Sequence, residues 1–305
     1  MFREVIPFPQ ALDLELTLPG SKSITNRAFL CAALAKGKSV IRGALLSDDT
    51  NIMLNALRKL EIGNLATEGS CTGLRSNNLR KGVQSHSVVE LRDDTVVIEG
   101  CGGQFTDKKL TLDLHNAGTA VRFLTAVMTI RKGETVITGN QRMQERPIGD
   151  LVEGLRQLGA NIEYLGEEGY PPFKIQDSKF PPRRAGKIQD SRYVVKMKGD
   201  TSSQYFSALL MLAPLLDRLL QLEVIGDLVS KPYIDTTIAV MKAFGVKVQN
   251  DHYKSFLVKP QAYKACEFTV EGDASAASYF TSIHYLHEGK LKFTNLNTNF
   301  DQKMS

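Results

Sequence analysis

The stretch LPGSKSITNR, residues 18–27, places hydroxyl groups and cations directly ahead of an apolar segment. Ser23 is expected to cap a helix there, with Lys22 before it and Arg27 one turn later on the same face. The first turn of a helix leaves backbone N–H groups unpaired and carries partial positive charge, which suits phosphate or carboxylate. The stretch therefore predicts either an ordinary helix start on a solvated surface or a cradle for an anion.

Two further helix starts offer the same chemistry. In NAGTAVR, residues 116–122, Gly118 permits close backbone approach and Arg122 follows one turn later. In TSSQ, residues 201–204, three polar side chains stand ahead of an apolar run: Ser202, Ser203 and Gln204. If the three starts point inward at one end of the molecule, they would form one concentrated anion pocket.

Two more segments extend this set. QRMQERPIG, residues 141–149, contains Arg142 and Arg146, and Pro147 is expected at a helix start. LVSKPYID, residues 228–235, contains Ser230, Lys231 and Tyr233. Each residue alone has an ordinary explanation as an N-cap, a solvated helix face, a tight turn or a packing residue. The prediction of an anion site therefore depends on the whole set.

Two other chemistries are disfavoured by spacing. GSKS at residues 20–23 lacks the P-loop pattern because Ser21 precedes Lys22, so no nucleotide triphosphate site is expected. His284 and His287 lie three residues apart without a third ligand. We interpret them as surface residues and expect no metal site.

Composition narrows the class of protein. A chain of 305 residues with 42% apolar and 23% charged residues is typical of globular proteins and long enough for two domains. The formal net charge of +5 favours anionic substrates, whereas the lack of a long Lys/Arg tract or any Trp disfavours nucleic acid.

The N-terminus, the longest apolar run and the cysteines indicate the cellular compartment. The N-terminal MFREVIPF lacks the apolar core of a signal peptide, and the longest apolar run, FSALLMLAPLL, is shorter than the roughly 20 residues that span a bilayer. The four cysteines are scattered without CxxC spacing, as reduced thiols are. We therefore expect a cytoplasmic protein without membrane association.

A structural unit recurs along the chain. Each copy has a small or hydroxyl-rich start, an apolar helix, a short strand, an amphipathic helix and another strand. Gly37 and Gly133 occupy matching places, where each is expected to close the first helix. The copies begin at 21, 116 and 202, and a fourth, at 272–296, lacks its second helix and last strand.

The repeats predict a domain division. Three units around a common centre would make one body of residues 21–271, and residues 1–20 with 272–305 would belong to a second, incomplete body. The polar stretch 66–87 is expected to form a long loop. The two copies of KIQDS, at 174–178 and 187–191, suggest a duplication on a surface hairpin.

Six segments in order resemble the EPSP synthase (3-phosphoshikimate 1-carboxyvinyltransferase) family, over about residues 5 to 294. They are LPGSKSITNRAFLCAALAKGKS, NAGTAVRFLTA, RMQERPIGDLVEGLRQLGA, SSQYFSALLM, DLVSKPYID and VEGDASAASYF. The resemblance implies the enolpyruvate transferase fold, an α/β (α+β) architecture of two globes, each with three βαβαββ repeats around a pseudo-threefold axis. The second globe would be incomplete here, with crossings near Pro19–Gly20 and Glu271–Gly272.

The same resemblance implies transfer of the enolpyruvyl group of phosphoenolpyruvate to the 5-hydroxyl of shikimate 3-phosphate, without cofactor or metal. Matched by motif, the shikimate 3-phosphate ligands would be Lys22, Ser23, Arg27, Ser202, Ser203, Gln204, Ser230 and Tyr233. The phosphoenolpyruvate ligands would be Lys22, Gly118, Arg146 and Gln204, with Asn116, Arg122 and Arg142 as neighbours. Lys22 would be catalytic, and the family's acid–base Asp and Glu would follow residue 305.

Two alternatives stay open at this stage. One is a non-catalytic fragment that only binds shikimate 3-phosphate; the other is the sister transferase acting on UDP-N-acetylglucosamine, which GSKSxxNR and SSQ disfavour. The family is usually monomeric, but the incomplete body predicts self-association through an apolar helix face near Tyr279 and Ile283. Two departures from the family pattern, His115 and Phe123, are expected to alter the phosphoenolpyruvate pocket and the sensitivity to glyphosate, respectively.

Overall fold

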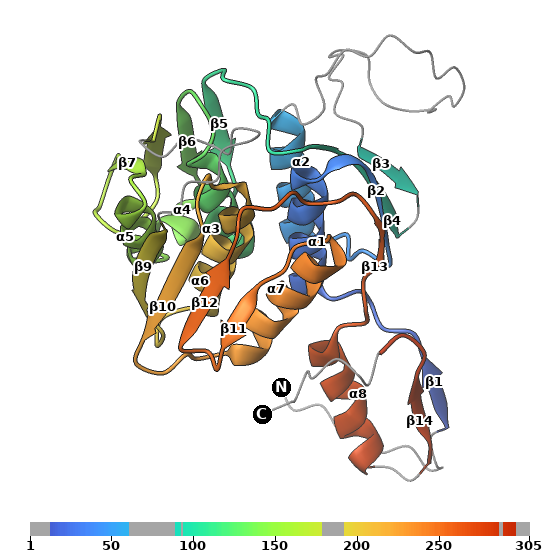
Figure 1. Ribbon diagram of the computed structural model, residues 1–305. Helices are drawn as coiled ribbons and strands as arrows, with labels where there is room; N and C mark the ends of the chain where they lie inside the picture. Colours follow the sequence, from blue (N-terminus) through green and yellow to red (C-terminus); the bar gives the residue numbers. More distant parts are fainter. Residues whose placement is uncertain (1–12, 61–88, 93, 179–191, 287–288, 297–305) are drawn as a thin grey trace, which may run out of the picture.

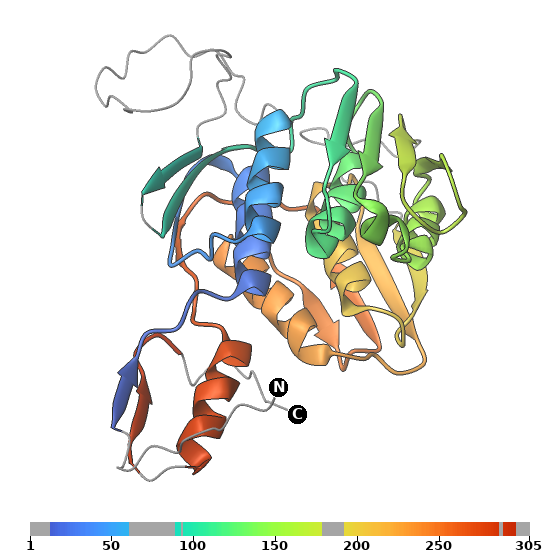
Figure 2. The ribbon, with the colours of Figure 1, turned by 180° about the vertical axis from the view of Figure 1, so that it is seen from behind.

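The computed structural model of the protein describes residues 13–60, 89–92, 94–178, 192–286 and 289–296. Within these residues, a large body built from helices and sheets is joined to a small body formed by one helix and two strands (Figure 1). Figure 2 shows the same two bodies from behind, connected by two chain segments that run side by side.

The described residues form three four-stranded sheets on one plan. In each, the first two strands are parallel and the other pairs are antiparallel. The first sheet contains β13 (Glu267–Thr269), β2 (Lys36–Arg42), β4 (Thr95–Cys101) and β3 (Val89–Arg92) in spatial order. The second contains β5 (Leu110–Asp113), β6 (Thr135–Thr138), β8 (Phe173–Gln176) and β7 (Asn161–Tyr164). The third contains β9 (Tyr193–Lys198), β10 (Leu220–Ile225), β12 (Ser255–Val258) and β11 (Gln249–Asp251).

Matching registers confirm that the sheets are copies of one another. Ile41, Ile137 and Leu222 occupy the same place on the second strand of each sheet, and all three are buried. Each is paired on both sides with an apolar residue: Ile41 with Phe268 and Val96, Ile137 with Leu112 and Phe173, and Leu222 with Val195 and Phe256. Period-2 alternation places these side chains on the face that packs against the helices.

Three helices occupy the centre of the large body, one from each unit. They are α1 (Lys22–Leu34), α3 (Gly118–Met128) and α6 (Ser203–Leu212), the last followed by the short η1 (Ala213–Leu215). Almost every residue of these helices is buried, as expected for helices surrounded by protein, and their polar residues include the buried Arg27 and Arg122.

The remaining helices are more peripheral: α2 (Asp48–Lys59), α4 (Gln141–Gln144), α5 (Gly149–Gln157) and α7 (Lys231–Ala243). They lock the units into a ring, because α2 contacts α3 and β5, α5 contacts α6 and β9, and α7 packs on α1. The expected α/β (α+β) fold with pseudo-threefold βαβαββ repeats is confirmed.

Three local expectations were wrong. Helix α1 ends at Leu34, so Gly37 lies within β2 rather than closing the helix. Helix α3 ends at Met128, and Gly133 forms the turn before β6. Pro147 precedes the N-cap Ile148 of α5 instead of occupying its first turn. In the first case the helix ends where the next strand of the sheet begins.

The small body takes a strand from the opposite end of the described chain. It consists of α8 (Ala274–Leu286), β1 (Leu14–Leu16) and β14 (Leu291–Phe293), and β1 pairs in parallel with β14. The strand before α1 therefore belongs to the small body, and β13 fills the vacated place beside β2. Each body holds a strand that a simple linear repeat would have assigned to the other.

The two crossings between the bodies are hydrogen-bonded to each other. The backbone N–H of Ser21 donates to the Glu271 carbonyl at 2.9 Å, and the Asp273 N–H donates to the Pro19 carbonyl at 2.9 Å. Gly20 and Gly272 form an isolated antiparallel bridge between these bonds. The expected crossings thus run side by side, while the division into residues 21–271 and the remainder stays a prediction.

Helix α8 exposes apolar side chains on one face. Tyr279, Tyr285 and Leu286 are 74%, 90% and 77% exposed, and Ile283 is 40% exposed. The self-association expected from this face stays a prediction. The stretch 66–87, residues 179–191 with the second KIQDS, and His287 lie outside the described residues; the first KIQDS begins in β8.

Candidate anion-binding site

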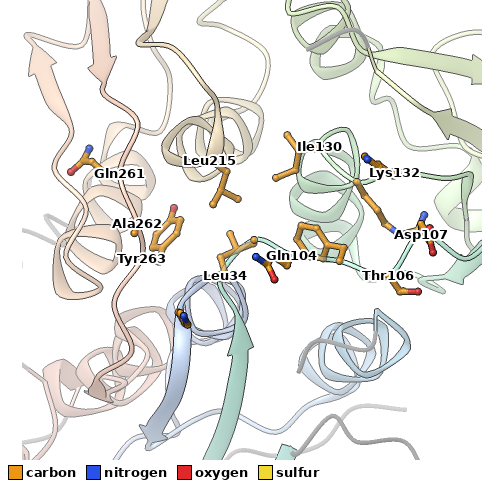
Figure 3. A pocket seen from close by; sticks show the side chains of 15 residues that line it. Leu34, Gln104, Thr106, Asp107, Ile130, Lys132, Leu215, Gln261, Ala262 and Tyr263 are labelled. Atoms are coloured by element: carbon orange, nitrogen blue, oxygen red, sulfur yellow. The ribbon is translucent and has the colours of Figure 1, made fainter. Parts of the chain in front are cut away.

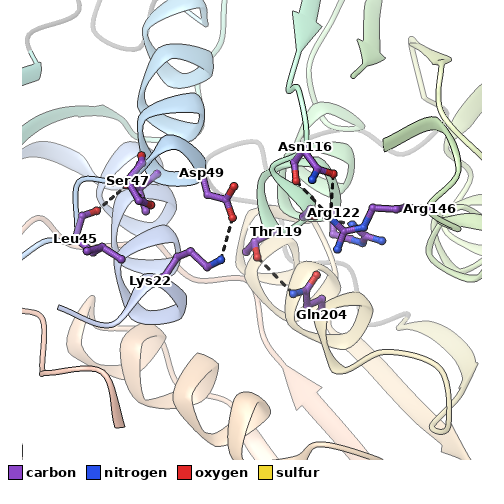
Figure 4. A network of polar contacts seen from close by, with 11 residues as sticks. Lys22, Leu45, Ser47, Asp49, Asn116, Thr119, Arg122, Arg146 and Gln204 are labelled. Carbon is purple, nitrogen blue, oxygen red and sulfur yellow. Dashed lines mark hydrogen bonds and ion pairs between the residues drawn. The ribbon is translucent and has the colours of Figure 1, made fainter. Parts of the chain in front are cut away.

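The first turns of α1, α3 and α6 lie at one end of the large body, where Figure 4 shows Lys22, Thr119 and Gln204 from the three helices. The N-cap of α1 is Ser21, so the expectation that Ser23 caps this helix was wrong. Lys22 is the first helical residue, and its Nζ lies 3.0 Å from Oδ2 of Asp49 in the first turn of α2. The Lys22 side chain is 48% exposed, so this ion pair is open to solvent.

Gly118 is the point where two arginines meet. A Cβ on Gly118 would lie 2.8 Å from Nη1 of Arg122 and 2.8 Å from both terminal nitrogens of Arg146. Arg122 Nη1 donates to the Gly118 carbonyl at 3.0 Å, and Arg146 Nη1 donates to the Asn116 carbonyl at 3.3 Å (Figure 4). Only glycine leaves room for both guanidinium groups against the first turn of α3.

The two arginines form a positive site without a counterion among the described residues. Arg122 is 6% exposed, and burial lowers the pKa of its guanidinium, an effect that the neighbouring Arg146 charge increases. Within the described part of the chain, no carboxylate lies within ion-pair distance of either side chain. Because two like charges held together in low dielectric repel each other, an anion bound between them would be strongly favoured.

The third helix joins this cluster through its first turn. The Ser202 hydroxyl caps α6 by accepting from the Gln204 N–H at 3.3 Å, at the helix start that the TSSQ pattern predicts. Gln204 Nε2 donates to the Thr119 hydroxyl of α3 at 3.4 Å. Asn116, Gly118, Arg122, Arg146 and Gln204 therefore lie in one connected neighbourhood.

Arg27 lies deeper, behind the first turns. It is 1% exposed, and its Nε donates to the Thr237 hydroxyl at 2.7 Å while Nη1 donates to the Ser23 carbonyl at 2.8 Å. Nη2 is 3.3 Å from the Ser207 hydroxyl and 3.4 Å from the Tyr233 carbonyl. The guanidinium thus links the backbones of two predicted ligands, and its own contact with a ligand stays a prediction.

The other predicted residues are more scattered. Ser203 is buried in the first turn of α6. Ser230 is the N-cap of α7, and Tyr233, 46% exposed, donates its N–H to the Ser230 carbonyl. Arg142 is exposed and pairs with Glu145 at 3.3 Å, and no hydrogen bond or ion pair joins it to the Gly118 cluster among the described residues.

Replacing Arg27 with methionine is expected to leave the free energy of unfolding unchanged or to raise it. Burial lowers the pKa of Arg27 to about 10, so the group remains charged at neutral pH at a cost on the order of 3 kcal/mol. Ser207 and Thr237 still bond each other at 2.8 Å without it, and an apolar side chain of similar length removes the buried charge.

We also expect Arg27→Met to lower the affinity for shikimate 3-phosphate. Urea unfolding measures the change in stability, and calorimetric titration with shikimate 3-phosphate measures the change in affinity. Arg131→Met is the matched control, since Arg131 is also buried and donates to the Thr135 hydroxyl at 2.8 Å, far from the first turns. A marked loss of stability confined to Arg27→Met would show that the hydrogen-bond network, rather than ligand binding, accounts for this arginine.

A separate cavity of about 590 Å³ lies at the opposite ends of the same helices (Figure 3). Leu34, Ile130 and Leu215 line it at the ends of α1, α3 and η1, and its charged lining residues are Lys36, Arg131, Lys132 and Asp107. Helix C-termini carry partial negative charge, which disfavours dianions. We therefore place the anion site at the N-terminal ends and assign no ligand to this cavity.

Comparison with known proteins identifies the family. A family model described as EPSP synthase (3-phosphoshikimate 1-carboxyvinyltransferase) matches residues 7–92 and 81–304. The chain belongs to the EPSP synthase family. The 3-phosphoshikimate 1-carboxyvinyltransferases of Actinobacillus pleuropneumoniae serotype 5b and Sulfurovum sp. are 46% and 45% identical to it over 292 and 288 residues. Each alignment covers 93% of this chain and 60% of the relative.

The EPSP synthase fold is also shown by a solved structure. The enzyme from Acinetobacter baumannii superposes with a TM-score of 0.70 at 23% identity, covering 90% of this chain and 54% of that one. The chain thus spans about 60% of the length of the curated EPSP synthases it matches. These matches leave the UDP-N-acetylglucosamine alternative without support.

The two departures from the EPSP synthase pattern have structural settings. His115 has φ 45°, in the left-handed region that favours the glycine common in the family. The buried Phe123 ring lies under the Arg27 guanidinium, with 5.2 Å from Cζ to the ring centroid. The expected effects on the phosphoenolpyruvate pocket and on glyphosate sensitivity stay predictions.

The remaining sequence expectations concern membrane association, the cysteines and the cellular compartment. None of the helices in the described ranges is long and apolar enough to cross a bilayer. Cys31, Cys101 and Cys266 are free thiols, and burial raises the pKa of Cys101 to about 11. A cytoplasmic location stays a prediction.

Proposed function

We propose that this protein transfers the enolpyruvyl group of phosphoenolpyruvate to the 5-hydroxyl of shikimate 3-phosphate, releasing phosphate. The proposal follows from membership of the EPSP synthase family together with the site at the helix N-termini. We infer that residues 21–271 form the body that binds shikimate 3-phosphate and that residues 1–20 with 272–305 belong to a second, partial body.

The observation that carries the proposal is the pair of arginines against Gly118. Arg122 and Arg146 present two cations without a carboxylate partner among the described residues, beside the first turn of α3. A phosphate or carboxylate there would receive charge-assisted hydrogen bonds from Arg146 and backbone N–H groups. We assign this place to phosphoenolpyruvate, with Lys22 and Gln204 on its other side.

Shikimate 3-phosphate is assigned to the neighbouring first turns of α1, α6 and α7. Its proposed ligands are Lys22, Ser23, Arg27, Ser202, Ser203, Gln204, Ser230 and Tyr233. Since Arg27 already links the Ser23 and Tyr233 carbonyls, the α1 and α7 starts are held together before any ligand arrives.

The proposed reaction proceeds through a tetrahedral ketal. The 5-oxygen bonds to C2 of phosphoenolpyruvate and loses its proton, and the methylene carbon gains one. Loss of phosphate and of a methyl proton then restores the enol ether. The cations named above would stabilise charge on the phosphates, and a water-excluding closed site would strengthen these interactions. The proposed chemistry calls for no cofactor.

Calorimetry and a phosphate-release assay test the proposal. We expect the chain to bind shikimate 3-phosphate and, in its presence, phosphoenolpyruvate. Release of phosphate dependent on both substrates would support transfer by this chain. Binding without release would support the non-catalytic alternative, and failure to bind shikimate 3-phosphate would overturn the proposed site.

A further inference from the structure

Tyr205 is a buried tyrosine that no sequence motif assigns to the site. It follows Gln204 in the first turn of α6 and is 4% exposed. Its hydroxyl donates to the Pro147 carbonyl at 2.7 Å, a bond between residues 58 positions apart. A phenylalanine would fill the same volume, so the hydroxyl requires an explanation of its own.

The acceptor of this bond adjoins Arg146. Arg122 Nη2 also donates to the Pro147 carbonyl, at 3.2 Å, so one oxygen is held by donors from both α6 and α3. Arg122 Nη1 donates to Gly118 as well, and therefore ties the start of α3 to the segment that carries Arg146. The backbone of a residue before proline is restricted. Fixing the Pro147 carbonyl therefore also limits the position of the Arg146 Cα, from which the side chain extends.

Repulsion makes this restraint necessary. Arg146 lies against Gly118 beside the like charge of Arg122, and its own printed partners are the Asn116 carbonyl at 3.3 Å and the Asn116 side-chain oxygen at 3.5 Å. Long contacts of this kind hold a guanidinium weakly. Its position against the repulsion of Arg122 therefore depends on the backbone that carries it.

We propose that Tyr205 is a positioning residue that holds the Pro147 carbonyl and so keeps Arg146 over Gly118 for the anionic group of phosphoenolpyruvate. The inference rests on the proposed function. The Tyr205 hydroxyl is therefore expected to affect the binding of phosphoenolpyruvate only. The contacts among Ser23, Tyr233 and Arg27, which are assigned to shikimate 3-phosphate, do not involve Pro147.

The test compares Tyr205→Phe with Tyr263→Phe by calorimetric titration. Tyr263 is a matched control: it is 3% exposed, and its hydroxyl donates to the Met211 carbonyl at 2.9 Å near the other end of α6. We expect Tyr205→Phe to weaken phosphoenolpyruvate binding about 3- to 10-fold, the range for one lost hydrogen bond, with affinity for shikimate 3-phosphate unchanged. Tyr263→Phe should change neither affinity.

A double-variant cycle separates positioning from a general structural effect. In an Arg146→Ala background, the Tyr205→Phe change should no longer alter the residual affinity for phosphoenolpyruvate. Equal affinity in wild type and Tyr205→Phe, or an equal loss in Tyr263→Phe, would overturn this inference while leaving the proposed function intact. If the wild-type chain binds neither substrate, the proposed function and this inference both fail.

Discussion

Arg146→Ala is expected to weaken phosphoenolpyruvate binding about 100-fold, because it removes the less buried member of the arginine pair that faces Gly118. A guanidinium that meets a phosphate or carboxylate forms charge-assisted, often bidentate hydrogen bonds, the strongest class available to a side chain. Arg122 cannot move into its place, since its Nη atoms are tied to the Gly118 and Pro147 carbonyls and its side chain is buried.

Calorimetric titration in the presence of shikimate 3-phosphate measures this loss. Arg142→Ala is the matched control: Arg142 is four residues away, exposed, and paired with Glu145 on the surface. It should bind phosphoenolpyruvate as wild type does. If the two variants lose affinity equally, net charge rather than the Gly118 pocket governs binding, and the assignment of Arg146 is wrong.

The second large effect is expected at the crossing between the two bodies. A Cβ on Gly20 would overlap the Gly43 carbonyl oxygen and lie 3.2 Å from the Leu45 nitrogen. All of these atoms belong to the backbone, so the crossing itself would have to move. Gly20→Ala should therefore lower the free energy of unfolding by about 3 kcal/mol, at the upper end of overpacking changes.

Movement of the crossing should also disturb its neighbour. The bonds from Ser21 to Glu271 and from Asp273 to Pro19 flank Gly20 on both sides. We expect amide exchange in β1 and β14 to accelerate in the variant, because these strands depend on the paired crossings for their position.

Gly166→Ala is the control for this experiment. The nearest atom to a Cβ at Gly166 is Pro172 Cδ at 3.7 Å, an ordinary contact, so the change should have little effect on unfolding. Urea unfolding and hydrogen exchange compare the two variants. Equal unfolding midpoints for both would contradict the tight packing at the crossing.

Some features of the site were predictable from short segments of the sequence. The TSSQ segment predicted a helix start, and α6 does begin at Ser203, because a polar stretch ahead of an apolar run involves only neighbouring residues. The NAGTAVR and RMQERPIG segments predicted basic side chains near helix starts, and Arg122 does follow the start of α3 by one turn while Arg146 lies just ahead of α5. Each of these predictions depends only on residues that are close together in the sequence.

Other features of the site had no local signal. Asp49 pairs with Lys22 across 27 residues, Tyr205 reaches Pro147 across 58, and Thr237 meets Arg27 across 210. Each of these residues looks like an ordinary helix or core residue in the sequence. Their roles depend on which helices become neighbours, which no spacing along a single helix specifies.

The order of residues alone was sufficient for the repeating unit, the apolar helix that starts each unit and the family, since each depends on periodicity and motifs within a few turns. The folded chain settled which strand completes each sheet: β13 rather than β1 lies beside β2, although both adjoin a similar helix–strand segment. The pairing of β13 with β2 joins distant parts of the chain, so neighbouring residues carry no signal for it. Closure of the ring of α2, α5 and α7 around the central helices is likewise a property of the whole assembly. The same closure buries Arg27 and brings Arg146 to Gly118.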